Sequence, residues 1–384
     1  MAVVALLAMT LQMNGCKPQE IPSLYDPNWK SLPQPIVDSL SPSFSLGGVG
    51  TLTVYGKNFS TKVDSEGVFF NSTLATLVSG TSTRIVLKTP NVTGDSVQVR
   101  VYVIGAADFS PTILYKMLPA ISPFGTLLGN LPGVLTTDSA GNSYVNLKTK
   151  AGVGQGTYKF TPNGSRTAFE TSTNIWFGIK VGPGGYLYLA RNLAAVFRVG
   201  PGGGAAALWV KTPGKVTDMD FDQNGVLWTG GNGTAIYSIN QASVVKSFPF
   251  PANIHAVKVY GADLYVAAGI DSSEAVWKFP ILASGDLGTP QKYFDFSAVY
   301  GYNTYSPLAM AFSQGGDLYI GTDAPDAIVI VHADGSHEPL YPGVFAPTVQ
   351  SLSWGSGTNL YISTTSGLFL VVAPASGAPN YGAQ

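Results

Sequence analysis

The sequence predicts an all-β protein in which a small β-sandwich is followed by a six-bladed β-propeller. Short runs of alternating apolar and polar residues, separated by turn residues, extend from residue 35 to residue 115, and this pattern is typical of strands with one buried face. Beyond residue 118, six segments of one form recur about every 40 residues, which is the length of a four-stranded propeller blade. The 45 Gly, 26 Pro, 19 Tyr and 19 Phe agree with many short strands joined by turns.

The charge balance argues against two classes of partner. The chain has 21 basic and 22 acidic residues, for a net charge of −1, and contains no run of Lys or Arg that could neutralise a series of phosphates. Neither nucleic acid nor general attraction to an anionic membrane is therefore predicted. With Cys16 as its one cysteine, the rest of the chain has no disulfide, Cys-ligated zinc or thiol nucleophile.

The N-terminus has the features of an export signal. Residues 1–15 are apolar but too few to span a bilayer core as a helix, so we expect the apolar region of a signal peptide. Gly15 followed by Cys16 resembles a bacterial lipobox, in which the chain is cleaved before the cysteine and its thiol receives diacylglycerol. The resemblance implies a lipid-anchored protein of the bacterial cell envelope, in the outer membrane or at the cell surface. An ordinary signal peptide with an incidental Cys16 is the alternative.

The expected domains follow from these patterns. Residues 1–16 are the signal peptide with Cys16, and residues 17–34, with three prolines among polar residues before Leu32, form an extended tether. The sandwich covers residues 35–117, and the propeller covers residues 118–384.

The first domain has about seven short strands, which predicts a sandwich. Its clearest strands are Thr51–Tyr55, Gly67–Phe70, Arg84–Leu87 and Val97–Val103. The order of Ile36–Pro42, Gly47-Gly48, Thr53–Phe59, Val68–Phe70 and Leu87–Pro90 resembles the IPT/TIG family of Ig-like domains. That resemblance implies a spacer or interaction module without catalytic residues.

Each of the six repeated segments combines an apolar strand, a Gly-containing turn and a second strand with an aromatic anchor. The segments are Leu135–Val145, Ile179–Leu189, Met219–Trp228, Val257–Val266, Met310–Ile320 and Leu352–Ile362. They resemble NHL-type propellers, whose repeats have a Val-Asp-x-x-Gly-Asn-Leu-Tyr-Val core, and the resemblance implies the architecture without a ligand. One blade cannot cover both of its own faces, so the ring must close. We expect Phe124–Asn130, which precedes the first unit, to be the outer strand of the last blade.

Aligning the six units predicts which residues line the central channel. One level holds Thr136, Lys180, Asp220, Lys258, Ala311 and Ser353, and a second level holds Val134, Gly178, Asp218, Ala256, Ala309 and Ser351. Residues two apart on a strand share a face, so Asp218 and Asp220 should both point into the channel, between Lys180 and Lys258 of the neighbouring blades. These residues form either a site for a small polar or cationic ligand or a metal, or, as we favour, a hydrated ring of compensating charges.

The connections that lead into the innermost strands should gather on one face and provide a ligand surface. Aromatic platforms mixed with polar groups suit carbohydrate, whereas packing between blades is the alternative role for Trp176 and the tyrosines. The candidate ligand-binding residues are Trp176, Arg191, Lys215, His255, Tyr300, Tyr302 and Tyr305.

The leading functional hypothesis is a non-catalytic surface protein that binds a glycan or another envelope component, such as an envelope protein. Similar architectures occur among surface proteins encoded with outer-membrane nutrient-uptake systems, which is an analogy of fold alone. The alternatives are a propeller hydrolase, lactonase or lyase that uses Asp218 or Asp220 with His255, and a scaffold for protein interactions. No cofactor, metal site or catalytic residue is predicted.

Overall fold

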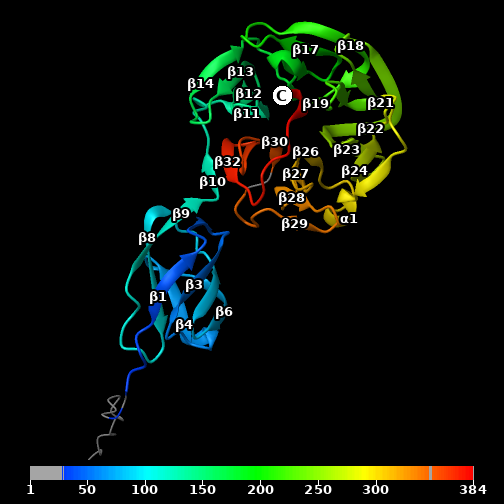
Figure 1. The fold of residues 1–384 in the computed structure, drawn as a ribbon. Helices are drawn as coiled ribbons and strands as arrows, with labels where there is room; N and C mark the ends of the chain where they lie inside the picture. The colour runs from blue at the N-terminus through cyan, green and yellow to red at the C-terminus, as the bar shows by residue number, and fades with distance from the viewer. Residues whose placement is uncertain (1–27, 29, 346–347, 384) are drawn as a thin grey trace, which may run out of the picture.

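The computed structural model describes residue 28, residues 30–345 and residues 348–383. The predicted signal peptide with Cys16, and the tether up to residue 27, lie outside the described residues. The fold is all-β: a sandwich and a propeller follow one another along the chain (Figure 1). No helix among the described residues has the length and apolar composition needed to cross a membrane.

The sandwich consists of a four-stranded and a five-stranded sheet. Its core is formed by alternate residues of facing strands, such as Leu52 and Val54 against Val99 and Val101, which are fully buried. The four strands predicted from alternation fall within the observed strands Thr51–Lys57, Glu66–Phe70, Arg84–Lys88 and Gly94–Val103, so that prediction is confirmed. The sheets have the orders β1(Ile36–Ser41)-β3(Thr51–Lys57)-β7(Arg84–Lys88)-β6(Thr76–Thr81) and β2(Phe44–Gly47)-β9(Ile113–Pro119)-β8(Gly94–Val103)-β4(Glu66–Phe70)-β5(Thr73–Leu74).

The propeller has six four-stranded blades, as predicted. Blade 1 is β11(Leu131–Thr137), β12(Ser143–Lys148), β13(Gly154–Phe160) and β14(Arg166–Glu170), and blade 2 is β15(Gly178–Val181), β16(Leu187–Ala190), β17(Leu193–Val199) and β18(Ala207–Val216). Blade 3 is β19(Asp218–Phe221), β20(Leu227–Gly230), β21(Asn232–Ile239) and the first half of β22(Val245–Tyr260); blade 4 is the rest of β22, β23(Asp263–Ile270), β24(Ser273–Pro280) and β25(Gln291–Phe294). Blade 5 is β26(Pro307–Phe312), β27(Leu318–Thr322), β28(Ile328–Val331) and β29(His337–Pro339), and blade 6 is β30(Val349–Trp354), β31(Asn359–Thr364), β32(Leu368–Val372) and β10(Ile121–Pro123).

Blades 3 and 4 are continuous with each other. Strand β22 has 16 residues; it pairs with β21 as far as Asn253 and with β23 from Asn253 onward. The outer strand of one blade thus becomes the inner strand of the next without a connecting loop, and the two blades form one seven-stranded sheet.

Ring closure occurs by the predicted route but a few residues earlier than predicted. Strand β10 (Ile121–Pro123) pairs antiparallel with β32 as the outer strand of blade 6, whereas the sequence had placed this strand at residues 124–130. Gly125, Leu128 and Gly129 have positive φ values, which end the extended conformation. Phe124 contributes its buried ring, whose centroid lies 4.6 Å from that of Tyr361.

The six aromatic anchors occupy equivalent positions in the blades. Each is buried on the second strand and pairs with an innermost-strand residue of the level predicted from alignment: Thr136 with Tyr144, Lys180 with Tyr188, Asp220 with Trp228, Lys258 with Tyr265, Ala311 with Tyr319 and Ser353 with Tyr361. Several anchors contact the next blade; Tyr188 lies 4.9 Å from Phe221 and Tyr319 lies 5.0 Å from Trp354, measured between ring centroids. The repeat in the sequence therefore encodes the packing of one blade on the next.

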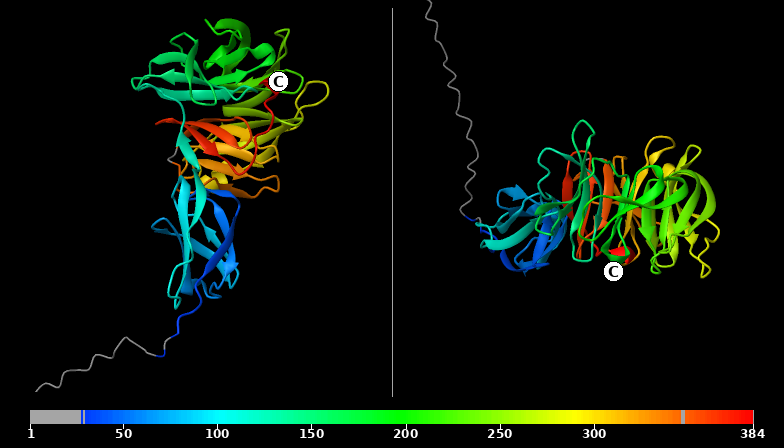
Figure 2. Two further views of the ribbon diagram at one scale, coloured as in Figure 1. Left: turned by 60° about the vertical axis from the view of Figure 1, so that its left-hand side comes forward. Right: turned by 90° about the horizontal axis from the view of Figure 1, so that it is seen from above.

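The C-terminal tail (residues 376–383) crosses one broad face of the propeller over the central channel (Figures 1 and 2). It is held by hydrogen bonds to several blades: the Ala378 amide donates to Phe312 O at 2.9 Å, and Asn380 Nδ2 donates to Thr137 O at 3.2 Å. Further along, the Tyr381 hydroxyl accepts from the Gly261 amide at 3.1 Å. The tail ends in a short 3-10 turn, η3 (Tyr381–Ala383).

Candidate functional site

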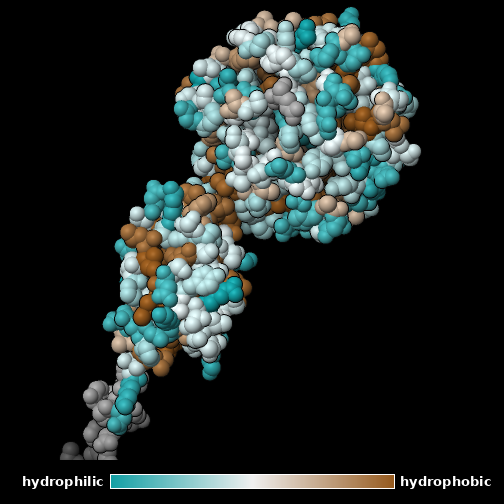
Figure 3. Space-filling view, viewed as in Figure 1, coloured by the Kyte–Doolittle hydropathy of each residue, from teal (hydrophilic) through white to brown (hydrophobic). Residues whose placement is uncertain are grey.

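The two faces of the propeller differ in the connections that form them. The loop face contains the connections that lead into the innermost strands, and the tail face contains the turns between first and second strands together with the C-terminal tail. Seen edge-on, the C-terminus lies on one side of the disc (Figure 2). Around the tail, that face mixes hydrophilic and weakly apolar residues (Figure 3). The channel between the faces contains the predicted polar residues.

Asp218 and Asp220 lie together at the junction between blades 3 and 4. Asp218 Oδ2 accepts from the amide of Val257 at 2.8 Å, and Asp220 Oδ2 accepts from the amide of Val259 at 3.0 Å. An innermost strand is the edge of its sheet, so half of its amides have no partner within the blade. The two carboxylates provide the missing acceptors, and they therefore connect blade 3 to the inner edge of blade 4.

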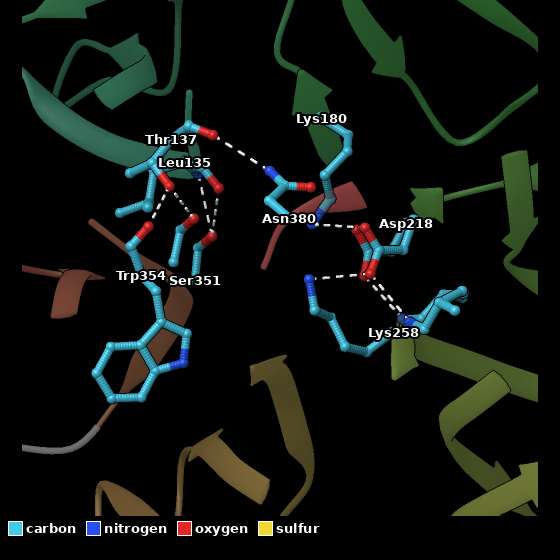
Figure 4. A network of polar contacts seen from close by, with 12 residues as sticks. Leu135, Thr137, Lys180, Asp218, Lys258, Ser351, Trp354 and Asn380 are labelled. Carbon is cyan, nitrogen blue, oxygen red and sulfur yellow. Dashed lines mark hydrogen bonds and ion pairs between the residues drawn. The ribbon is translucent and has the colours of Figure 1, made fainter. Parts of the chain in front are cut away.

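Ser351 and Ser353 occupy the same two levels at the junction between blades 6 and 1. Ser351 Oγ accepts from the amide of Leu135 at 3.0 Å, and the hydroxyls of Ser353 and Thr137 are 2.8 Å apart. Thr137 also donates to the carbonyl of Trp354. Figure 4 shows these contacts together with Lys180, Asp218 and Lys258 across the channel. Uncharged hydroxyls here connect the last blade to the first.

Lys180 and Lys258 both form ion pairs with Asp220. The Lys180 Nζ–Asp220 Oδ1 distance is 3.2 Å and the Lys258 Nζ–Asp220 Oδ2 distance is 2.9 Å, with the Asp220 side chain 2% exposed and the lysines 14% and 12% exposed. Burial by itself would raise the pKa of Asp220, but the two ammonium groups lower it below its usual value. Asp220 is therefore ionised and bridges blades 2, 3 and 4.

Asp218 has a different electrostatic environment. Burial raises its pKa to about 6, against the opposing attraction of Lys180 and the hydrogen bond from Val257. Burial also lowers the pKa of Lys258 despite its pairing with Asp220. When all four groups are ionised, the two lysines balance the two aspartates.

The channel carboxylates are two, and the described part of the chain adds no third ligating side chain to them. No group of three or more His, Cys, Asp or Glu side chains in residues 28, 30–345 and 348–383 is arranged to hold an ion. The oxygens of Asp220 are already in contact with two ammonium groups and one amide.

Below the lysines, the channel opens into a cavity of about 330 Å³ on the tail face, which we call the tail-side cavity. Its walls come from blades 1, 2, 4, 5 and 6, and residues 377–380 of the tail cover part of it. Polar lining residues include Thr137, Lys180, Lys258, Gln314, Ser353 and Asn380, together with Trp354. The cavity is therefore a polar chamber beneath the charged channel group.

The loop-face mouth of the channel is narrower, with a cavity of about 40 Å³. Phe177, His255, Leu308 and Gln350 are among its lining residues. His255 Nε2 lies 3.1 and 3.0 Å from the two carboxylate oxygens of Glu274, and both side chains are mostly buried. The sequence hypothesis paired His255 with Asp218 or Asp220. Asp218 lines the same cavity as His255, but the hydrogen bonds of His255 are to Glu274.

Trp176 is not available for ligand stacking in this structure, which corrects its place among the ligand candidates. It is 2% exposed, its ring lies 5.6 Å from that of Phe197 between centroids, and its Nε1 donates to Glu170 Oε2 at 2.9 Å. Trp176 therefore packs within the propeller, which is the alternative role considered for it. The following residue, Phe177, faces the opposite way and is 51% exposed.

The three candidate tyrosines lie between β25 and β26, and they divide into packed and exposed members. Tyr300, at the end of α1 (Phe296–Tyr300), is half-buried and donates its hydroxyl to Asp326 Oδ2 at 3.1 Å. Tyr305 packs against the apolar cluster shared by blades 4 and 5. Tyr302 is 60% exposed.

Arg191 and Lys215 are both exposed, and their segments are neighbours, since the Asn192 amide donates to Val216 O at 2.9 Å. They lie at the edge of blade 2, whereas Tyr302 precedes blade 5 on the opposite side of the ring. The candidate residues are therefore spread around the loop face.

Two features of the site were missed by sequence reasoning. Phe177 could have been found because alternate residues of an extended segment face opposite ways, so that a buried Trp176 exposes its neighbour. The cover provided by the tail had no local signal in the sequence.

Comparison with known proteins assigns the first domain to a family. Residues 35–116 match the model of the IPT/TIG domain. No curated protein sequence matches this chain.

Several solved structures resemble about nine-tenths of the chain. An auxiliary nutrient binding protein from Bacteroides ovatus shares 11% identity with a TM-score of 0.51, over 89% of this chain and 99% of that chain. A putative phosphatase from Bacteroides thetaiotaomicron shares 11% identity with a TM-score of 0.54, over 90% of this chain and 98% of that chain. A protein of unknown function from the same species shares 14% identity with a TM-score of 0.51, over 91% and 99%. At such identities the likeness concerns the fold. The chain thus contains an IPT/TIG domain at residues 35–116, followed by a six-bladed β-propeller.

Proposed function

We propose that this protein is a non-catalytic binding protein of the bacterial cell envelope, which holds a glycan or another extended envelope component on the loop face of its propeller. The observation that carries this proposal is the engagement of both channel aspartates by backbone amides of blade 4. Carboxylates that accept backbone amides of the next blade connect the blades, which supports a structural role for them.

The loop face supports binding of an extended ligand. Phe177 and Tyr302 are exposed aromatic residues, and Arg191 and Lys215 are exposed basic residues on the other side of the ring from Tyr302. The cavity at the mouth is too small for more than a water-sized group. A ligand that contacts both sides must therefore lie across the face.

The envelope location rests on the N-terminal pattern and on fold similarity. Cys16 after Gly15 resembles a lipobox, and one structure of similar fold is described as an auxiliary nutrient binding protein. We expect Cys16→Ser to move the protein from the membrane fraction to the soluble fraction of the producing bacterium. Membrane association that is unchanged in the variant would refute lipid anchoring through this residue.

Binding can be tested by affinity electrophoresis in gels that contain soluble polysaccharides. We expect retarded migration in at least one gel, and a roughly tenfold loss of affinity for Tyr302→Ala or Phe177→Ala, as for removal of an aromatic contact of about 1.4 kcal/mol. Tyr55→Ala, which removes an exposed aromatic residue of the sandwich, is the matched control. Equal loss in the control, or no retardation in any gel, would count against the loop face.

A hydrolase or lyase is the second candidate, favoured by the His255–Glu274 pair at the channel mouth. A histidine oriented by a carboxylate can act as a general base. Turnover that is lost in His255→Ala and kept in His332→Ala would establish this candidate in place of the first.

A further inference from the structure

Two lysines that line the tail-side cavity have N–H groups beyond those used by their ion pair. Lys180 and Lys258 each have three N–H groups, and within the described residues each has one ion-pair partner, Asp220. Both lysine side chains are slightly exposed and line the cavity. Ammonium groups with remaining N–H bonds form strong hydrogen bonds to carboxylate oxygens, so this wall favours an occupant with such acceptors.

The acidic residues near the cavity do not meet this need. Asp138 lines it, but its carboxylate accepts from the amides of Ala140 and Asn142, the Asn142 side chain and the Tyr144 hydroxyl. Asp218 accepts the Val257 amide instead of a lysine hydrogen bond. Figure 4 shows the two lysines meeting the Asp218–Asp220 strand from different blades, with Asn380 of the tail close by.

We propose that the tail-side cavity binds a small organic carboxylate of about monosaccharide size, whose oxygens accept hydrogen bonds from Lys180 and Lys258. Two ammonium groups that converge on one carboxylate, Asp220, can bridge a second carboxylate in the same way. The volume of about 330 Å³ lies at the lower end of the range of roughly 300–1,000 Å³ in which proteins hold small molecules. Asn380 and the Ser353 hydroxyl place further polar groups in the wall for ligand hydroxyls.

The C-terminal tail defines the size of this ligand. Residues 377–380 line the cavity, and hydrogen bonds from Ala378 to blade 5 and from Asn380 to blade 1 fix them there. Gly377 lies so close to the Trp354 ring that a Cβ atom would be 2.2 Å from the indole. The cover thus fits tightly, and the site is on the opposite face from the surface proposed for a glycan.

The test is calorimetric titration of the protein with D-galacturonate and with D-galactose, which differ by the carboxylate. We expect D-galacturonate to bind at least tenfold more tightly, as for loss of a charge-assisted hydrogen bond. Equal binding of the two sugars, or no heat from D-galacturonate up to about 10 mM, would overturn the proposal. Equal competition by sulfate would overturn the carboxylate assignment.

Variants separate this site from other anion contacts. Lys258→Gln should weaken D-galacturonate at least tenfold, while Lys278→Gln, which breaks an ion pair with Asp263 elsewhere in blade 4, should leave it unchanged. Unchanged affinity in folded Lys258→Gln overturns the proposal.

A trisaccharide of galacturonate distinguishes the source of the carboxylate. Binding of the monosaccharide alone supports a free acid beneath the tail, and binding of both supports the end of an acidic polymer at the same lysines. Tyr302→Ala should not affect either titration, so failure of the loop-face proposal and failure of this one are distinguishable.

Discussion

At the blade 3/4 junction and at the blade 6/1 junction, backbone amides of an innermost strand need hydrogen-bond acceptors from the neighbouring blade. The two junctions provide these acceptors with different side chains. At both, side chains at two levels of an innermost strand contact the next innermost strand: Asp218 and Asp220 accept from its amides, Ser351 accepts an amide, and Ser353 contacts a threonine. The blade 3/4 junction joins strands that are 39 residues apart in the chain, whereas the blade 6/1 junction joins strands 216 residues apart.

The difference shows that these positions require a hydrogen-bond acceptor, which can be either charged or uncharged. A hydroxyl at the blade 6/1 junction requires no counter-ion, but carboxylates at the blade 3/4 junction require Lys180 and Lys258 because an unpaired buried charge is costly. The two lysines that neutralise the carboxylates of the blade 3/4 junction therefore also line the tail-side cavity. The tail connects the two regions, since Asn380 bonds to Thr137 and Tyr381 bonds to Gly261.

The largest expected effect comes from removing the shared charge of the blade 3/4 junction. Asp220→Ala leaves two buried ammonium groups without their partner and the Val259 amide without an acceptor. We expect the free energy of unfolding to fall by about 3–5 kcal/mol, measured by urea denaturation. Asp286→Ala, at an exposed ion pair with Lys246, is the control and should show no measurable change. A loss below about 1 kcal/mol for Asp220→Ala would mean that the channel group behaves like a surface pair.

An intermediate effect of opposite sign is expected for Asp218→Asn, which keeps an oxygen for the Val257 amide. The pKa of Asp218 is about 6 in the folded protein, above its value of about 3.9 in the unfolded chain. The folded state therefore holds the proton more tightly, so the contribution of Asp218 to stability is fully present below pH ~4 and is lost as the pH rises through 6. We expect the variant to be more stable by about 1–3 kcal/mol at pH 7.5. This gain should disappear when unfolding is measured at pH 4, and a gain independent of pH would contradict the assignment.

The smallest of the three effects belongs to the uncharged junction. Ser351→Ala leaves the Leu135 amide without its acceptor, and we expect destabilisation by about 1–2 kcal/mol with no dependence on pH between 4 and 8. Thermal unfolding at both pH values measures it, with the exposed Ser356 of the same blade changed to Ala as control. A loss of stability as large as that of Asp220→Ala would show that the effect depends on ring closure and not on charge.

Several features could be predicted from the sequence because they depend on residues close together in the chain. The recurrence of an aromatic anchor about every 40 residues indicated six blades. Aligning the six units placed one residue of each innermost strand at a common level, and these residues pair with the anchors in the structure. Strand periodicity also placed Asp218 and Asp220 on one face. Hairpin register depends on local turns and on the alternation of apolar residues, and both can be recognised in the sequence.

Other features were decided only when the blades packed together. Alternation predicts that Trp176 and Phe177 face opposite ways, but it could not tell which of the two would be covered. It also could not tell that the Asp218 and Asp220 carboxylates would bond to amides of the next blade. The tail over the channel depends on contacts with residues more than a hundred positions away, such as Gly261 and Thr137. Burial and hydrogen-bond partners across blades result from the closure of the ring, which no short stretch of sequence contains. The sequence by itself therefore determined the repeating unit. The tertiary structure decided which polar and aromatic groups of that unit remain exposed to a ligand.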